Sequence, residues 1–276
     1  MDKLIIPAGD KEQIEVYSHI GPFDKGIAVL NKEKLAIWTA SDLAEARMLG
    51  GAKHPVSREW SWVGENFNYL PDGDILVASR DYNPILKNPE QATDCHRSGK
   101  EFYLDKRIAK DLRERAEKNP EKAVKSGVLL LPRNAVESEI PSTALKDEPL
   151  TRFLFRDTAK PYGQFLKENG INSVPVYVVD ADYAKNQKQA LGRALWVGSL
   201  IGGSGLHGGD DGLHFSDGRV RGVRRVPAER AAPKVPNEAK VECLENILAA
   251  LKEGAAFNYN GTIYVPVKRE VIERAK

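Results

Sequence analysis

The feature that most constrains the fold of this chain is a glycine-rich stretch between two strand signals, residues 195–225. The stretch opens with an apolar segment that contains a tryptophan, and it closes with a segment in which basic and apolar residues alternate. Between them, Gly, Ser, Asp, His and a few aliphatic residues take nearly every position. So much backbone freedom leaves little for a packed interior and is typical of surface loops. The stretch therefore predicts loops presented by a sheet.

The composition excludes several classes of protein. A chain of 276 residues, 41% hydrophobic and 29% charged, can build one large or two small globular domains. Its net charge of +2 gives no reason to expect nucleic acid or an anionic membrane as a partner. No apolar run is long enough for a membrane span or a signal peptide, so we expect a protein that stays cytoplasmic or is assembled into a virion. Cys95 and Cys243 match no metal spacing and are expected to be free thiols.

Short strands and a few helices are predicted along the chain, which indicates an α+β protein. Strands are expected at residues 4–8, 26–31, 35–39, 59–64, 75–79, 127–132, 174–179 and 194–198. Helices are expected at 43–49, 107–118, 161–169 and 181–192, with an extended piece at 150–155 and turns at 81–100. After a linker that starts at Pro227, a helix at 238–254 and a strand at 262–267 are expected. We therefore expect one domain over residues 1–226 and a helix–strand appendage over residues 227–276.

The glycine-rich stretch contains a match to the dinucleotide-binding pattern G-x-G-x-x-G, from Gly203 to Gly208. That pattern needs a helix directly afterwards, whose N-terminus would hold the pyrophosphate. The residues that follow indicate a further loop and a strand, and no Walker lysine is present. The match is therefore weak evidence for a nucleotide site.

Two histidines and two aspartates of the same stretch, His207, Asp210, Asp211 and His214, suit a zinc or iron site by residue type. A glycine-rich loop preorganises ligands poorly, and no surrounding residue is placed to orient them. Solvated polar loop residues are the favoured interpretation, so no metal and no cofactor are assigned.

Two other groups have a functional and a structural interpretation. Cys95 stands beside His96, but neighbouring side chains on an extended chain point apart, and catalytic pairs usually come from distant segments. Trp60, Trp62 and Tyr69 could form a platform for stacking a sugar ring, although such residues more often belong to a core. Neither group predicts an enzyme.

The closing segment is basic, and its arginines could contact phosphate. Their alternation instead favours one outward face of a strand, with Val220 and Val223 turned inward. The arginines in question are Arg219, Arg221, Arg224 and Arg225.

The stretch from Gly198 to Gly218 contains no Lys, Glu, Gln, Met or Trp, although Lys and Glu are abundant elsewhere. These five amino acids are the ones that codons ending in a pyrimidine cannot encode. Adenine-specific mutagenesis of AAY codons would leave such a composition.

The residues on either side of this stretch resemble the end of a C-type-lectin-type domain. The opening segment is Trp196-Val197-Gly198-Ser199 and the closing one is Gly218-Arg219-Val220-Arg221-Gly222-Val223-Arg224. Both are similar to elements of the branch shared by formylglycine-generating-enzyme-like proteins and the variable proteins of diversity-generating retroelements. Here Val223 replaces the usual aromatic residue of the closing motif, and residues 226–276 follow where the family's variable segment commonly ends the chain. The formylglycine-generating activity is not implied, because the stretch lacks the cysteine pair.

The resemblance implies a C-type-lectin-like scaffold for non-catalytic ligand binding by a hypervariable surface at about residues 196–225. Trp196, Gly198, Gly222 and Val223 are expected to be fixed scaffold. The residues expected to contact ligand are Ser199, Leu200, Ile201, Ser204, Leu206, His207, Asp210, Asp211, His214 and Ser216. The partner would be an unidentified protein or glycan, in a microbial or viral setting, and oligomerisation is left open.

The alternative is a small-molecule enzyme, or an anion- or metal-binding protein, that uses the loop at residues 198–212. A helix beginning near Gly208 would favour this alternative. Two strands on either side of an irregular loop would favour the binding protein.

Overall fold

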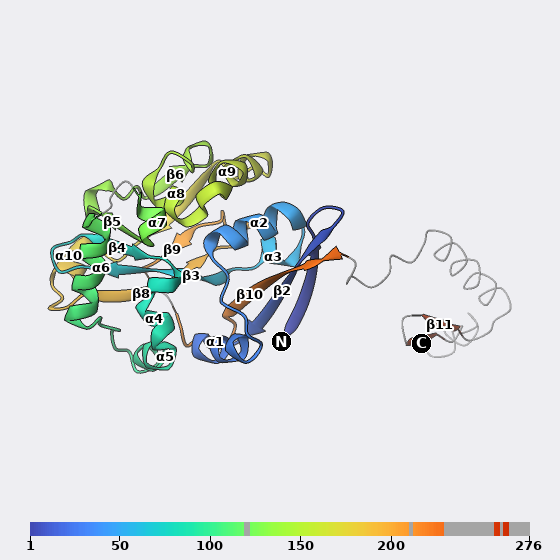
Figure 1. The fold of residues 1–276 in the computed structure, drawn as a ribbon, viewed down its shortest axis with the longest axis horizontal. Helices are drawn as coiled ribbons and strands as arrows, with labels where there is room; N and C mark the ends of the chain where they lie inside the picture. The colour runs from blue at the N-terminus through green and yellow to red at the C-terminus, as the bar shows by residue number, and fades with distance from the viewer. Residues whose placement is uncertain (119–121, 210–211, 229–256, 260–261, 265–276) are drawn as a thin grey trace, which may run out of the picture. The chain divides into compact units, whose positions relative to one another are not determined.

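The computed structural model describes residues 1–118, 122–209, 212–228, 257–259 and 262–264 (Figure 1). The chain divides into two compact units, Met1–Ala228 and Glu229–Lys276. The boundary expected from the sequence falls after Val226. Of the second unit, the strands β11 (Phe257–Tyr259) and β12 (Thr262–Tyr264) are described, and they pair antiparallel. The expected helix at 238–254 lies outside the described residues.

A mixed sheet of ten strands organises the described part of the first unit. The strands follow the order β1-β2-β10-β3-β8-β9-β7-β6, and β4 and β5 extend the sheet from β3. Their bounds are β1 (Asp2–Pro7), β2 (Glu12–Ile20), β3 (Ser61–Tyr69), β4 (Ile75–Ala78), β5 (Val128–Leu131), β6 (Glu139–Pro141), β7 (Ser173–Tyr177), β8 (Leu191–Val197), β9 (Leu206–His207) and β10 (Arg219–Pro227). Because β10 pairs antiparallel with β2, the two ends of the unit lie side by side.

Helices cover both faces of the sheet. Figure 1 places α1 (Phe23–Lys32) below and α2 (Ala40–Gly50) above the β2–β10 pair. The other helices are α3 (Pro55–Arg58), α4 (Pro84–Lys87), α5 (Pro89–Arg97), α6 (Lys106–Lys118), α7 (Ala123–Ser126), α8 (Pro149–Phe155), α9 (Ala159–Glu168) and α10 (Ala181–Lys185), with short 3-10 helices η1 (Arg80–Tyr82), η3 (Arg133–Ala135), η4 (Ser142–Ala144) and η5 (Arg156–Thr158). Strand β3 and residues 220–222 of β10 are thereby buried.

Two segments expected to be extended are helical. The strand expected at 26–31 is wrong, because Phe23, Ile27 and Leu30 recur at helical spacing and form the buried face of α1. The extended piece expected at 150–155 is also wrong. There the Glu148 carboxylate accepts the backbone N–H groups of Leu150 and Thr151 and caps α8.

Most of the other expected elements are present with shifted ends. Strands β1, β3, β4, β5, β7 and β8 and helices α2, α6, α9 and α10 overlap their expected ranges. The segment 35–39 contains only an isolated bridge between Ile37 and Gly222, and the segment 81–100 holds α4 and α5 rather than turns alone. Helix α2 starts at Ala40 because Thr39 and Asp42 form a capping box.

Candidate ligand-binding loops

The glycine-rich stretch folds into two loops joined by the short strand β9. The first, the β8–β9 loop, comprises residues 198–205 and is closed by a 2.8 Å hydrogen bond from the Gly198 N–H to the Gly205 carbonyl. The second, the β9–β10 loop, comprises residues 208–218 and returns to β10 beside α1. No helix starts in its described residues, 208–209 and 212–218. The G-x-G-x-x-G match therefore lacks the helix that a pyrophosphate site needs.

The structure places only some of the expected contact residues at the surface. Ile201, at the tip of the β8–β9 loop, is 75% exposed, and His214 and Ser216 of the β9–β10 loop are exposed. Ser199 and His207 are half-buried. Asp210 and Asp211 lie outside the described residues.

Leu200, Ser204 and Leu206 are buried, which corrects the expectation that they face a ligand. The Leu200 N–H donates to the Ser57 carbonyl, and its side chain belongs to the hydrophobic core. Leu206 lies in β9 opposite Val176 of β7. Ser204 has no exposed surface, and its backbone has a left-handed φ of 57°. These three residues therefore hold the loop rather than present it.

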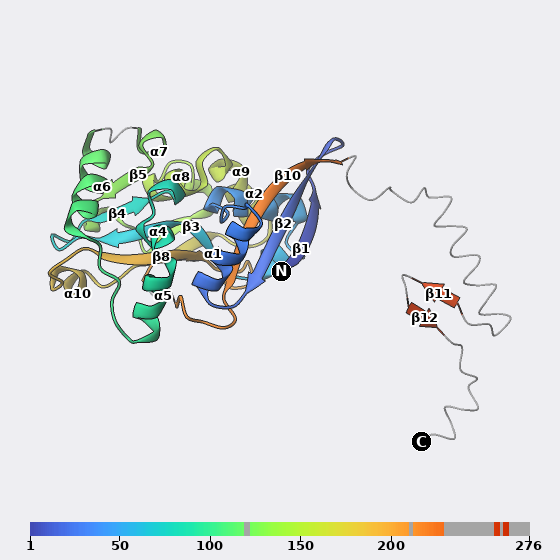
Figure 2. The same cartoon turned by 60° about the horizontal axis from the view of Figure 1, so that its bottom comes forward.

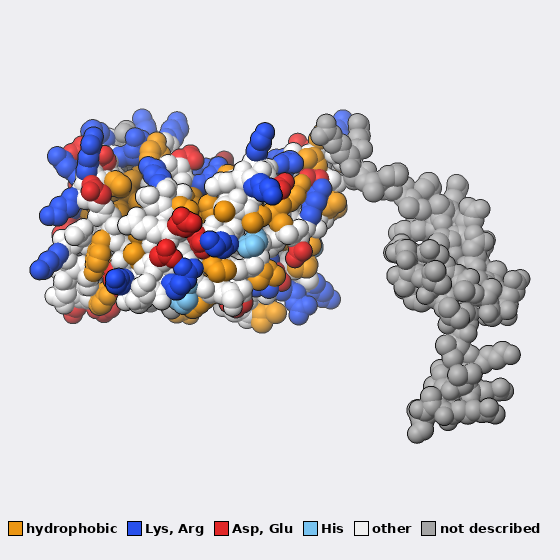
Figure 3. Space-filling model, turned by 90° about the horizontal axis from the view of Figure 1, so that it is seen from below, with side chains coloured by type: hydrophobic (Ala, Val, Ile, Leu, Met, Phe, Trp, Pro, Cys, Tyr) orange, Lys and Arg blue, Asp and Glu red, His pale blue; other side chains and the backbone are white. Residues whose placement is uncertain are grey.

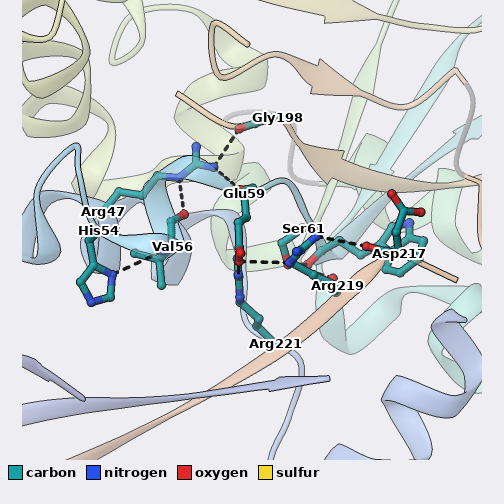
Figure 4. A network of polar contacts seen from close by, with 10 residues as sticks. Arg47, His54, Val56, Glu59, Ser61, Gly198, Asp217, Arg219 and Arg221 are labelled. Atoms are coloured by element: carbon teal, nitrogen blue, oxygen red, sulfur yellow. Dashed lines mark hydrogen bonds and ion pairs between the residues drawn. The ribbon is translucent and has the colours of Figure 1, made fainter. Parts of the chain in front are cut away.

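A fully buried arginine of α2 holds the base of the β8–β9 loop (Figure 4). The Arg47 guanidinium donates to the Gly198 carbonyl at 2.8 Å and to the Ser204 hydroxyl at 3.0 Å. Its other acceptors are the Tyr162 hydroxyl and the carbonyls of Val56 and Glu59. An arginine has five N–H donors, and here five bonds go to uncharged acceptors. The sequence carries no signal for this cluster, because its members come from distant segments.

Glu59 joins the start of β10 to the segment that precedes β3 (Figure 4). Its carboxylate lies 3.0 Å from the Arg219 guanidinium and also accepts a hydrogen bond from Arg221. Burial lowers the pKa of Arg221 to about 10, so this residue stays charged at neutral pH. The expectation that Arg221 faces outward is wrong, because its side chain is buried over the Trp38 ring and pairs with Glu59. Arg224 and Arg225 are exposed, as expected.

Four rings lie in contact beside the β8–β9 loop, and we call them the aromatic row: Trp60, which is tilted against its neighbour, and the stacked rings of Trp196, His207 and Tyr177. The ring centroids of Trp196 and His207 lie 3.5 Å apart, and those of His207 and Tyr177 lie 4.3 Å apart. Trp60 contacts Trp196 at 5.2 Å. The stack follows from strand register, since Trp196 in β8 and Tyr177 in β7 both pair with His207 in β9.

The aromatic row is partly open to solvent. Tyr177 is 51% exposed, and the other three rings are half-buried. Trp62 and Tyr69 are core, which is the interpretation that the sequence favoured over a stacking platform, and Trp60 alone of the three joins the aromatic row. Tyr177 was not among the expected contacts. Its alternation with the buried Val176 along β7 is the signal that marks it as an outward residue.

Glycines let the loop approach the aromatic row. A Cβ at Gly205 would lie 3.0 Å from Nε2 of His207 and 3.2 Å from Cε2 of Tyr177. Gly198 stands over the same imidazole, where a Cβ would lie 3.7 Å from Nε2. The β8–β9 loop therefore packs directly against the aromatic row.

The β9–β10 loop is held against the start of α1. The Phe23 N–H donates to the Leu213 carbonyl at 2.9 Å, and the Leu213 side chain is buried. Between these fixed points and β10, the side chains of His214, Phe215 and Ser216 are exposed. The ring centroids of His214 and Phe215 lie 5.0 Å apart. Phe215 is a further candidate contact that the expected set omitted.

On the face that carries α1 and α5, acidic and basic side chains are interspersed with apolar ones (Figure 3).

The other chemical interpretations find no support in the described residues. No group of three His, Cys, Asp or Glu side chains converges on a metal position there, and the two aspartates of the hypothetical metal site are not described. Cys95 is half-buried against the core in α5. Within the same described ranges, no helix is long and apolar enough to cross a membrane.

These observations define an α+β protein with the C-type lectin fold, as the sequence predicts. The chain is similar to a solved structure from work on the accommodation of massive sequence variation in Nanoarchaeota by the C-type lectin fold. The TM-score is 0.54 at 16% identity, and the match covers 77% of this chain and 98% of that chain. A likeness at this identity shows the fold alone. No protein-family model and no curated protein matches the chain.

Proposed function

We propose that this chain is a non-catalytic binding protein whose recognition surface is the exposed part of residues 196–225 together with the adjoining Trp60 and Tyr177. That surface comprises the β8–β9 loop tip at Ile201, the exposed residues of the β9–β10 loop, and the aromatic row. The observation that carries the proposal is the division of this stretch into buried residues that hold the loops and exposed residues that do not. Side chains of the second kind can vary without cost to the core.

The β8–β9 loop shows this division most clearly. Its base is fixed by Arg47 through Gly198 and Ser204. Its tip turns through backbone bonds, from the Gly202 N–H to the Ser199 carbonyl and from the Gly203 N–H to the Leu200 carbonyl. The side chain of Ile201 takes no part in these two bonds, and the residue is 75% exposed. The loop conformation therefore does not depend on the side chain at the position that a ligand would meet first.

The chemistry of the surface suits a protein or glycan ligand. Exposed aromatic side chains such as Tyr177 pack against sugar rings and apolar side chains, and they lose little conformational entropy on binding. Ser199, His214 and Ser216 add short polar groups that adapt their hydrogen bonds to different partners.

We further propose that a retroelement diversifies this surface. Two observations support that origin: the absence of Lys, Glu, Gln, Met and Trp between Gly198 and Gly218, and the likeness of the fold to one that accommodates massive sequence variation in Nanoarchaeota. The exposure of each residue indicates which positions of residues 199–216 we expect to vary. Variation should reach Ser199, Ile201, His214 and Ser216, whereas Ser204 should stay fixed and Leu200 and Leu206 should stay apolar.

Sequencing the encoding locus in related isolates tests this origin. We expect substitutions at adenines within codons 199–216, a near-identical template repeat nearby, and few changes at the buried positions. An invariant stretch without a repeat would exclude diversification by a retroelement. Changes that fall equally on buried and exposed codons would contradict the assignment of the surface.

Displayed libraries test ligand binding itself. One library randomises Ile201, His214 and Ser216 in the full chain, and the control randomises the exposed helix residues Lys110, Lys160 and Glu168. Selection against a panel of proteins and glycans should enrich binders from the first library only. Equal enrichment from both libraries, or from neither, would contradict the proposed recognition surface.

A further inference from the structure

A cavity of about 650 Å³ lies apart from the glycine-rich loops, where α7, β5, α8 and η5 meet. Helices α7 and α8 lie side by side in both ribbon views (Figures 1 and 2). The volume is in the range of sites for small molecules and cofactors. The residues that line it are of two kinds, basic and apolar.

The basic residues greatly outnumber the acidic ones. Five cations line the cavity against one carboxylate, that of Asp157. Lys146 lies 3.8 Å from the neighbouring Asp147 carboxylate. The other four, namely Lys122, Lys125, Arg152 and Arg156, form no ion pair with any described residue. Cations gathered without partners repel one another, and this repulsion is relieved by an anion bound among them.

Several arginines outside the cavity have carboxylate partners. Arg113 of α6 contacts the carboxylates of Asp72, Asp74 and Glu117. Arg97 and Arg225 also have carboxylate partners. Arg152 and Arg156 have no such partner among the described residues, and exposed arginines outside the cavity, such as Arg58 and Arg107, share this state.

The remaining lining is apolar. Phe153 and Leu129 are buried, at 4% and 8% exposure, and form a floor with Pro149. Val124 lines the same cavity and is 41% exposed. A ring or other flat apolar group placed here would cover Val124 and lie against the floor.

The backbone holds two of the cations at the cavity by a strained turn. Arg156 has a φ of 51°, a left-handed value that residues with a Cβ rarely adopt. Its N–H donates to the Arg152 carbonyl at the end of α8, so both arginines leave the same turn. Strain of this kind concentrates at ligand-binding sites.

Lys122 and Lys125 also line a second cavity of about 500 Å³ beside α6. These two lysines therefore stand between the cavities. A ligand whose ring occupies the first cavity could place a chain of negative groups along them.

We propose that the cavity between α7 and α8 binds a small molecule that joins a flat apolar ring to two or more negative charges. A nucleoside diphosphate has this composition and is the test ligand. Phe153, Pro149 and Val124 take the ring, and the lysines and arginines take the phosphates. This site is independent of the proposed recognition surface.

Titration calorimetry of the full chain with ADP, adenosine and pyrophosphate tests the proposal. We expect ADP to bind with a Kd in the micromolar range at low salt, and adenosine and pyrophosphate to bind at least about tenfold more weakly. The double variant K125A/R152A should weaken ADP binding by at least about tenfold. The control K160A/K167A removes the same charge from α9 and should leave binding unchanged.

The single variants K125A and V124S keep the test decisive if the double variant fails to fold, since both change exposed side chains. Each should weaken ADP binding several-fold. Absence of ADP binding at millimolar concentration would overturn the proposal, as would equal affinity for ADP and pyrophosphate or for ADP and adenosine. ADP binding that is unaffected by the cavity variants would place the site elsewhere and would also overturn it.

Discussion

The guanidinium of Arg47 donates a 3.0 Å hydrogen bond to the hydroxyl of Ser204, across 157 positions of sequence, and both side chains are fully buried. The bond connects the second helix of the fold to the base of the β8–β9 loop. Arg47 also bonds Gly198, at the other end of that loop. The loop is therefore held by a residue outside the stretch proposed to vary.

Arg47→Leu should destabilise the protein by at least about 3 kcal/mol, because it leaves three carbonyls without this donor, and of the two hydroxyls, which bond each other, only one can still accept. Ser204→Ala removes one of these acceptors and should cost about 1–2 kcal/mol. Urea unfolding measures both, with Lys110→Ala on the exposed face of α6 as the control. A loss below about 1 kcal/mol for Arg47→Leu would show that the cluster does not hold the loop.

Ile201→Ser should change the free energy of unfolding by less than about 0.5 kcal/mol, because the side chain is largely exposed. Leu206→Ala, only five positions later, should cost about 2–5 kcal/mol, because it leaves a cavity in the core. Thermal and urea unfolding of the two variants compare a presented residue with a supporting one. Similar losses for both would contradict the division of the stretch.

Gly205→Ala should destabilise the protein by about 1–3 kcal/mol and disturb the aromatic row, because the new methyl group would meet His207 and Tyr177. Gly202→Ala is the matched control, since its Cβ would meet only Ser199, at 3.4 Å. Tryptophan fluorescence should report the first change through Trp196, which stacks on His207. An unchanged spectrum for Gly205→Ala would show that the imidazole is not packed under the loop.

Glu65 should make stability depend on pH near neutrality. Its carboxylate is buried and accepts the Ala40 N–H at 3.0 Å, and burial raises its pKa from 4.5 to about 7. The folded protein therefore binds a proton more tightly than the unfolded chain. The contribution of Glu65 to stability is full below pH 4.5 and is lost as the pH rises through 7.

Glu65→Gln keeps the shape of the neutral side chain and removes this titration. The variant should match the parent protein near pH 5 and exceed its stability at pH 8 by about 1–3 kcal/mol. Comparing unfolding curves of the two proteins at each pH cancels the titration of His19 and His54, whose pKa values burial lowers. A constant difference across this pH range would contradict the raised pKa of Glu65.

Local pattern was enough to predict the α+β class, most strands and the helices at α2, α6 and α9. It failed at α1 and α8. In both segments the run of apolar residues suggests a strand. The helix α1 is indicated only by the helical spacing of Phe23 and Ile27, and the helix α8 only by its capping residue, Glu148. The resemblance carried by Trp196-Val197-Gly198-Ser199 and the closing motif predicted the fold, because these segments overlap β8 and β10, which both pair with β3 in the middle of the sheet.

The sequence by itself determined where the loops lie, because glycines and short polar residues cannot form a core. Only the tertiary structure decided which loop residues face solvent. Ser204 and Ser216 are the same amino acid in the same kind of stretch, yet one bonds Arg47 in the interior and the other is exposed. Burial depends on partners from α2, α3, α9 and β7, and contacts between distant segments leave no periodic signal in the stretch itself.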